Sequence, residues 1–178
     1  MNDILNHTSN LAGSAFAHCA NLTSVSFNEG FEYLGSYAFS GTPITEVTLP
    51  TTLKDAVYPF ENSSVEKATF ADGTERIPNW TFNKCTTLKE VTIPKTVKSI
   101  GSYAFRGCKS LSDFTFHEGL EYLGSYAFSD TGITEVTLPS TLKTADYPFE
   151  NSSVEKASFA DGAKNIPSWL FNKCSTEN

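Results

Sequence analysis

The stretch SYAFSGTPITEVTLP, residues 36–50, returns 89 residues later as SYAFSDTGITEVTLP at residues 125–139. The match extends without a gap over residues 28–85 and 117–174, which agree at about 45 of 58 positions. Such self-similarity is the sequence signature of repeat architectures. The sequence therefore predicts two homologous blocks, at about 1–89 and 90–178.

A shorter period lies inside each block. A phenylalanine recurs every 21–23 residues and follows a small residue or proline in every case but the last, where Leu170 precedes it. The members of this series are Phe16, Phe39, Phe60, Phe82, Phe105, Phe128, Phe149 and Phe171. A unit of about 22 residues cannot bury its apolar side alone, whereas stacked units bury a continuous core. We expect one solenoid over residues 1–178 with about eight coils, in which these phenylalanines form a buried spine.

Most of these phenylalanines are followed by a run with apolar residues at positions 1, 4 and 6, as at Leu88, Val91 and Ile93. Positions 4 and 6 alternate with the period of a strand, so their side chains share one face. Threonine and β-branched residues between them favour extended structure. The pattern predicts seven short strands, one per coil, in one continuous parallel sheet. The SYAF stretch is predicted to form a short helical turn after a corner marked by Gly or Pro.

The sequence LKEVTIPKTVKSIGSYAFRGCKSL at residues 88–111 fits the motif LxxVxIPxxVxxIGxxAFxxCxxL and resembles the BspA-type leucine-rich repeat. The resemblance covers nearly the whole chain, although the 21-residue coils that end at Phe60 and Phe149 carry Tyr-Pro-Phe in place of Tyr-Ala-Phe. It implies an α/β repeat solenoid, a right-handed leucine-rich-repeat superhelix. A parallel β-sheet would line its concave face, and short helical turns or irregular segments its convex side.

Two columns of outward residues are expected on the sheet. They contain candidate partner-binding residues: Glu46, Thr48, Lys67, Thr69, Glu90, Thr92, Asp113, Thr115, Glu135 and Thr137. The hydroxyl column is either a ladder that stabilises the strands or a hydrogen-bonding strip for a ligand. In the charged column, Lys67 is expected near both Glu46 and Glu90, in ion pairs of at most about 1 kcal/mol. Asp113 would stand beside Glu90 and Glu135, where it could attract a basic partner or a cation.

An aromatic residue stands two positions before most spine phenylalanines. The candidate binding residues of this ribbon are Tyr37, Tyr58, Trp80, Tyr103, Tyr126 and Tyr147. These rings either roof the core or form a binding stripe for sugars or protein, because Tyr and Trp join apolar area to a polar tip.

The four cysteines, Cys19, Cys85, Cys108 and Cys174, each stand three residues after a spine phenylalanine. Ser or Thr occupies the same place in other coils, so we expect free, buried, structural thiols. A Cys85–Cys108 disulfide is the less favourable alternative, because stacked coils hold Cβ atoms farther apart than the usual ~3.8 Å. No metal or cofactor is expected, because there is no close cysteine pair and no phosphate-loop or catalytic motif.

The formal charge of −7 argues against nucleic-acid binding, since phosphate backbones repel an acidic chain. No run of about 18 apolar residues occurs, so no membrane insertion is expected. The N-terminus lacks the basic start and apolar stretch of a signal peptide. Both ends are expected to be incomplete coils, which predicts a longer array or end-to-end self-association.

The resemblance implies a non-enzymatic binding module. Its partner would be a protein or glycan ligand on the extracellular side. The module itself would be at the cell surface or secreted, and its role would be adhesion. The alternative is a structural or assembly element, either an engineered tandem repeat or a fragment of a longer array. The near-identity of the two blocks keeps that alternative open.

Overall fold

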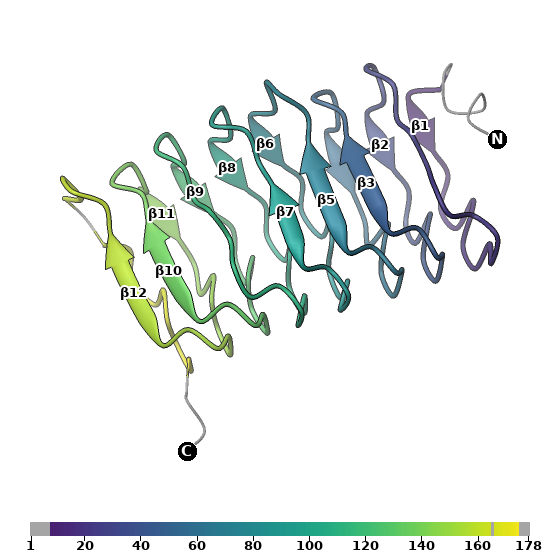
Figure 1. Ribbon diagram of the computed structural model, residues 1–178. Coiled ribbons are helices and arrows are strands. Elements are labelled where there is room, and N and C mark those ends of the chain that lie inside the picture. Colours follow the sequence, from purple (N-terminus) through teal and green to yellow (C-terminus); the bar gives the residue numbers. More distant parts are fainter. Residues whose placement is uncertain (1–7, 165, 175–178) are drawn as a thin grey trace.

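The computed structural model describes residues 8–164 and 166–174, which form a solenoid of parallel strands (Figure 1). The long strands lie in two groups, a three-stranded sheet β3-β5-β7 and a two-stranded sheet β10-β12. Their bounds are Glu46–Leu49 (β3), Lys67–Phe70 (β5), Glu90–Thr92 (β7), Glu135–Leu138 (β10) and Lys156–Phe159 (β12). Successive coils therefore place equivalent segments side by side.

A second row of two-residue strands was not predicted. It comprises Asn10–Leu11 (β1), Tyr33–Leu34 (β2), Asp55–Ala56 (β4), Arg76–Ile77 (β6), Ser99–Ile100 (β8), Tyr122–Leu123 (β9) and Thr144–Ala145 (β11). These strands are parallel and pair in the orders β1-β2-β4 and β11-β9-β8-β6. These seven short strands mark about seven turns of the solenoid.

The long strands follow the predicted period of two. In β3 and β10 the side chains alternate between exposed and buried, with Val47 and Leu49 facing the core in β3. The register places Glu46 beside Lys67 and Lys67 beside Glu90. The predicted alignment of the coils is confirmed here, because a slip of one residue would bury these charges.

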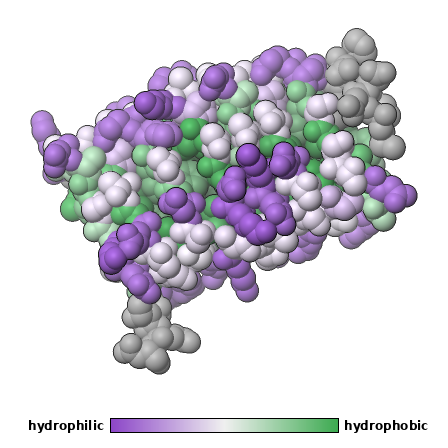
Figure 2. All heavy atoms as spheres, in the orientation of Figure 1, coloured by the Kyte–Doolittle hydropathy of each residue, from purple (hydrophilic) through white to green (hydrophobic). Residues whose placement is uncertain are grey.

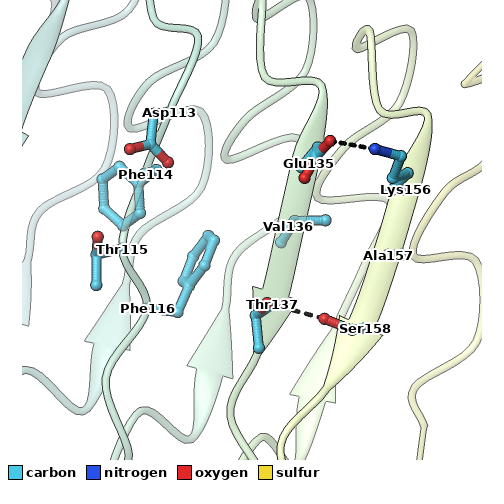
Figure 3. A pocket seen from close by; sticks show the side chains of 10 residues that line it. All are labelled: Asp113, Phe114, Thr115, Phe116, Glu135, Val136, Thr137, Lys156, Ala157 and Ser158. Atoms are coloured by element: carbon cyan, nitrogen blue, oxygen red, sulfur yellow. Dashed lines mark hydrogen bonds and ion pairs between the residues drawn. The ribbon is translucent and has the colours of Figure 1, made fainter.

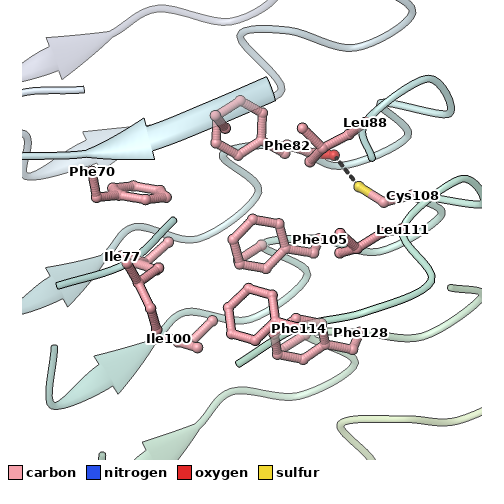
Figure 4. Close-up of a cluster of buried hydrophobic side chains, with 14 of the residues drawn as sticks. Phe70, Ile77, Phe82, Leu88, Ile100, Phe105, Cys108, Leu111, Phe114 and Phe128 are labelled. Carbon is pink, nitrogen blue, oxygen red and sulfur yellow. Dashed lines mark hydrogen bonds between the residues drawn. The ribbon is translucent and has the colours of Figure 1, made fainter. Parts of the chain in front are cut away.

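The phenylalanine spine is confirmed. The rings of Phe16, Phe39, Phe60, Phe82, Phe105, Phe128, Phe149 and Phe171 stack in sequence, with centroids 5.2–5.9 Å apart and planes within 20°. The six interior rings are fully buried, whereas Phe16 and Phe171 are partly buried. Figure 4 shows three of them packed against Ile77, Ile100 and Leu111. The stack therefore runs along the solenoid, and each coil contributes one ring to it.

The predicted helical turns are wrong, and no helix occurs among the described residues. Each SYAF-type segment instead holds two residues at positive φ, four positions apart, such as Tyr103 at 58° and Gly107 at 73°. A right-handed helix cannot include such residues. The N–H of Phe105, which lies between them, donates to the carbonyl of Ala127 in the next coil at 2.8 Å. The N–H groups of this segment alternate between bonds to the next coil and turn-like bonds to carbonyls three residues back, such as Arg106 to Tyr103. The helical part of the predicted α/β class is therefore absent from the described residues.

The prediction of seven strands in one continuous sheet is also wrong. Residues 24–27 and 113–116 occupy strand positions but form no strand, so the long strands separate into β3-β5-β7 and β10-β12. The inward pairs in these two coils are Val25/Phe27 and Phe114/Phe116.

Side-chain volume explains the two exceptions. Every paired long strand has a smaller inward pair, either Val with Leu or Ile, or Ala with Phe as in Ala68 and Phe70. A close-packed core has no room for extra atoms, so a bulky pair displaces its backbone outward. This reason applies most directly to segment 113–116, where Phe114 is buried and packs against Phe105 and Phe128. At segment 24–27, in the first described coil, Val25 and Phe27 are only partly buried.

All four cysteines are free thiols, as predicted. Cys85 and Cys108 are buried, but Cys19 is exposed and Cys174 is only partly buried. The expectation of four buried thiols is therefore wrong at Cys19. Cys19 lies in the first coil that the structure describes and is not covered on both sides by neighbouring coils.

Candidate binding surfaces

The face formed by the long strands β3, β5, β7, β10 and β12, called the concave face here because the family resemblance implies it, presents the predicted hydroxyl column. The register aligns Thr48, Thr69 and Thr92 on β3, β5 and β7, and Thr137 with Ser158 on β10 and β12. Thr48, Thr92 and Thr137 are exposed, and the hydroxyls of Thr137 and Ser158 lie 2.8 Å apart. Figure 2 shows this face as a mixture of hydrophilic side chains and hydrophobic surface. Threonine hydroxyls can donate and accept, so the column can adapt to either type of group.

The charged column forms ion pairs between neighbouring coils. Lys67 Nζ lies 3.9 Å from a carboxylate oxygen of Glu90. Glu46 is the register partner of Lys67 on the other side, yet no ion pair joins them. The predicted three-membered ladder is therefore reduced to one ion pair. In the second block, Lys156 instead contacts Glu135 at 2.5 Å, and this hydrogen bond raises the pKa of Lys156.

Asp113 and Thr115 are exposed on segment 113–116. This segment belongs to no ladder, so Asp113 does not stand in register between Glu90 and Glu135 as predicted. No ion pair of Asp113 is found within the described part of the chain. Its carboxylate is held at the surface by a segment that is detached from both flanking strands.

An open groove of about 470 Å³ lies between segment 113–116 and strands β10 and β12 (Figure 3). A second groove, of about 340 Å³, lies at the same place in the first block, against segment 24–27 and strands β3 and β5. Its lining consists of Ser24, Val25, Ser26, Phe27, Glu46, Val47, Thr48, Lys67 and Thr69. Adding 89 to each of these numbers gives a residue that lines the first groove. The duplication has therefore reproduced a surface feature as well as a fold.

The residues that line the grooves include four candidates predicted from the sequence, Glu46, Thr48, Glu135 and Thr137, but the grooves themselves were not predicted. The signal was available in the inward pairs. Only the coils of Val25/Phe27 and Phe114/Phe116 combine a phenylalanine at position 6 with a residue larger than alanine at position 4.

The aromatic ribbon is a continuous stack on another side of each coil. Its neighbouring rings, from Tyr37 through Tyr58, Trp80, Tyr103, Tyr126 and Tyr147 to Trp169, lie 5.3–6.0 Å apart. All seven residues adopt positive φ, between 48° and 61°. The interior rings cover one another's faces and present their edges and polar tips. Only Tyr37 and Trp169, at the ends, are strongly exposed, at 41% and 63%.

Charged residues flank the ribbon. Lys84 pairs with Glu61 at 3.2 Å, Arg106 lies 3.6 Å from Asp130, and Lys173 pairs with Glu150 at 2.8 Å. The guanidinium of Arg106 also lies 5.9 Å from the ring centroid of Tyr103. These ion pairs lie beside the ribbon. The rings also line two hollows of about 340 Å³ each, one along Tyr37, Tyr58, Trp80 and Tyr103 and one at Tyr103 and Tyr126.

Two kinds of feature are absent from the described residues. No three His, Cys, Asp or Glu side chains gather in a way that could hold a metal ion within residues 8–164 and 166–174. Nor does this part of the chain contain a helix with the length and apolar character needed to cross a membrane.

Comparison with known proteins gives a clear family match. The family model for the BspA type leucine rich repeat region matches six copies, over residues 2–58 and 56–178. No curated protein matches the sequence.

Two solved bacterial structures share the fold. A leucine-rich repeat protein from Bacteroides ovatus is 20% identical with a TM-score of 0.50, and the match covers 94% of this chain. The chain spans 62% of the length of that protein. A leucine-rich repeat protein of T. pallidum is 20% identical with a TM-score of 0.51, over 75% of this chain and 72% of that one.

Proposed function

Because the chain belongs to the BspA-type leucine-rich repeat family, we propose that it is a non-enzymatic module that binds a partner protein on its concave face. The observation that carries the proposal is the aligned, exposed array of Glu46, Thr48, Lys67, Glu90 and Thr92 on three paired strands. A regular polar surface of this kind matches an extended macromolecule better than a small substrate, which needs an enclosing pocket.

The charges of the array support the same proposal. Exposed ion pairs such as Lys67–Glu90 contribute at most about 1 kcal/mol to folding, so their side chains are free to exchange partners at little cost. The net charge of −7 favours a partner with a basic surface, because complementary potentials accelerate encounter. Members of the family are typically surface proteins. By that resemblance the partner would be extracellular, and the module would be a surface-exposed or secreted adhesin.

A glycan ligand is the less supported alternative. Sugars dock by stacking on the faces of aromatic rings, and the interior rings of the ribbon cover one another. Only Tyr37 and Trp169 leave a face open, at opposite ends of the stack. We therefore assign partner binding to the concave face and keep the ribbon as scaffold.

A binding screen of the chain against extracellular-matrix proteins and glycan arrays tests the proposal. For any partner found, Thr92→Arg places a large cation in the middle of the concave array and is expected to weaken binding at least about tenfold. Thr86→Arg is the matched control, because Thr86 is also exposed but lies off the strands. Loss of binding in Tyr126→Ala with full binding in Thr92→Arg would move the site to the ribbon and overturn the proposal.

A further inference from the structure

We propose that each of the two grooves on the concave face receives one extended peptide strand of the partner protein. The strand pairs with the open edge of β3 in the first groove and of β10 in the second. This inference deepens the proposed function and rests on it, since it says how the partner is held. It is carried by unpaired backbone groups, by the charges of the lining and by the duplication of the groove.

The edge of β10 that faces the groove is open. On its other side, the carbonyls of Thr134 and Leu138 accept backbone hydrogen bonds from the coil of β12, at 2.8–3.1 Å. Alternate residues of a parallel strand bond to opposite neighbours, so the backbone groups of Glu135 and Thr137 face the groove.

Segment 113–116 does not satisfy these groups. Among the described residues, no backbone hydrogen bond joins residues 112–116 to the coil before or after them. In the preceding coil, which carries the paired strand β7, the corresponding backbone bonds do exist. There the N–H groups of Lys89 and Glu90 both donate to the carbonyl of Glu66. Residues 24–27 likewise make no backbone bond to β3. Each groove thus exposes a row of main-chain donors and acceptors, which is the template for strand addition.

The second groove favours a basic strand, because its lining carries the carboxylates of Asp113 and Glu135 against the one lysine Lys156. In the first groove Glu46 and Lys67 balance, so the preference there comes from the acidic chain as a whole. Asp113 and Glu46 are exposed carboxylates for which no ion pair occurs within the described part of the chain, and the chain as a whole is acidic. Thr137 and Thr48 add hydroxyls on the groove-facing strands. A groove four residues long accommodates about 13 Å of extended chain. The expected occupant is therefore a strand of about four residues with Lys or Arg among its outward side chains.

The duplication makes the site bivalent. The two grooves lie four coils apart, a separation of roughly 20 Å at about 4.8 Å per coil. Both open edges have the sequence EVTL and the same direction, so they offer the same backbone pairing to a strand. A partner with two such strands gains from effective concentration when the linker between them spans this distance, which needs about 13 flexible residues.

The cause of the open edge provides a test on the free protein. Phe114→Ala recreates the Ala/Phe pair of the paired strands β5 and β12, and the double substitution Phe114→Val with Phe116→Leu recreates the Val/Leu pair of β10. Either change is expected to let segment 113–116 join β10 and close the groove. Hydrogen exchange at Glu135 and Thr137 should then slow at least about tenfold. Val91→Ala is the matched control, because β7 is already paired with β5.

Binding is tested with a synthetic ten-residue peptide in which Thr and Val alternate and Lys stands at every fourth position. A second peptide carries N-methyl groups on alternate residues, so that it keeps the side chains and loses the donors of one edge. We expect the first peptide to shift the NMR amide signals of Glu46, Thr48, Glu135 and Thr137, and the second to bind at least about tenfold more weakly. The groove-closing variants should lose only the shifts of the second groove. A tandem peptide with a 13-residue linker should bind at least tenfold more tightly than the single one.

Failure of this inference is distinct from failure of the proposed function. Equal binding of the two peptides, or unchanged binding after closure of the second groove, would overturn strand addition. So would shifts that fall on Glu90 and Thr92 of β7 instead, although that result would still support binding on the concave face. A glycan that shifts the groove amides when neither peptide does would also overturn it.

Discussion

The thiol of Cys85 donates a hydrogen bond to the carbonyl of Phe60 in the preceding coil, over 3.0 Å. The hydroxyl of Ser63 donates to the same carbonyl from within its own coil, over 2.7 Å. Cys108 repeats the inter-coil contact with the carbonyl of Phe82, at 3.1 Å (Figure 4). At this position Thr42, Ser63 and Thr131 bond the spine carbonyl of their own coil, whereas Cys85, Cys108 and Cys174 bond that of the preceding coil. A small donor fits either contact, which explains why Cys, Ser and Thr interchange here.

The thiols are expected to react at very different rates in the native protein. Cys19 is exposed and should be labelled within the mixing time of an Ellman assay, whereas Cys85 and Cys108 are buried and should react only through opening of the fold. Peptide mapping after a short pulse with a maleimide identifies the labelled sites. Rapid labelling of Cys108 in the folded protein would contradict the structure.

Stability is expected to fall at alkaline pH. Burial raises the pKa values of Cys85 and Cys108, so the folded chain keeps protons that the unfolded chain releases above its ordinary thiol pKa of about 8.5. Each thiol then lowers the free energy of unfolding by about 1.4 kcal/mol per pH unit. The double variant Cys85→Ser/Cys108→Ser should lose this slope in urea titrations between pH 8 and 10. Equal slopes in the two proteins would refute the assignment.

Removal of an interior spine ring should strongly destabilise the solenoid. Phe105→Ala empties a fully buried position between the rings of Phe82 and Phe128, and we expect a loss of about 3–5 kcal/mol in the free energy of unfolding. Phe16→Ala is the control, since Phe16 is only partly buried and stacks on Phe39 alone among the spine rings. Urea denaturation followed by tryptophan fluorescence measures both, and similar losses would count against the spine.

Replacement of each of two glycines by alanine should destabilise the fold, for a different physical reason in each case. A Cβ on Gly101 would meet Oδ1 and N of Asn79 at 2.5 and 2.6 Å, a clash with the neighbouring coil that should cost at least about 3 kcal/mol. Gly107 has φ of +73°, and its Cβ would meet Lys84 at an ordinary 3.5 Å. Gly107→Ala should therefore cost only the backbone strain of about 1–2 kcal/mol. Thermal unfolding of the pair tests the order, and a larger loss in Gly107→Ala would reverse the explanation.

The spacing of the phenylalanines and the alternation in runs such as Glu46–Leu49 were sufficient to predict the coil, the spine, the parallel direction of the strands and their register. These features follow from local periodicity, because residues two apart in a strand share a face and equivalent residues of stacked coils share a column.

The shape of the convex side and the breaks in the concave sheet were decided only in three dimensions. Tyr103 adopts a left-handed conformation, and the neighbouring Phe105 donates to a carbonyl that exists only because the next coil is there. Segment 113–116 leaves the ladder because the volumes of Phe114 and Phe116 add to those of the spine rings of Phe105 and Phe128, which they contact. Local pattern names the residues that point inward, but whether they fit depends on the sum of side chains around them.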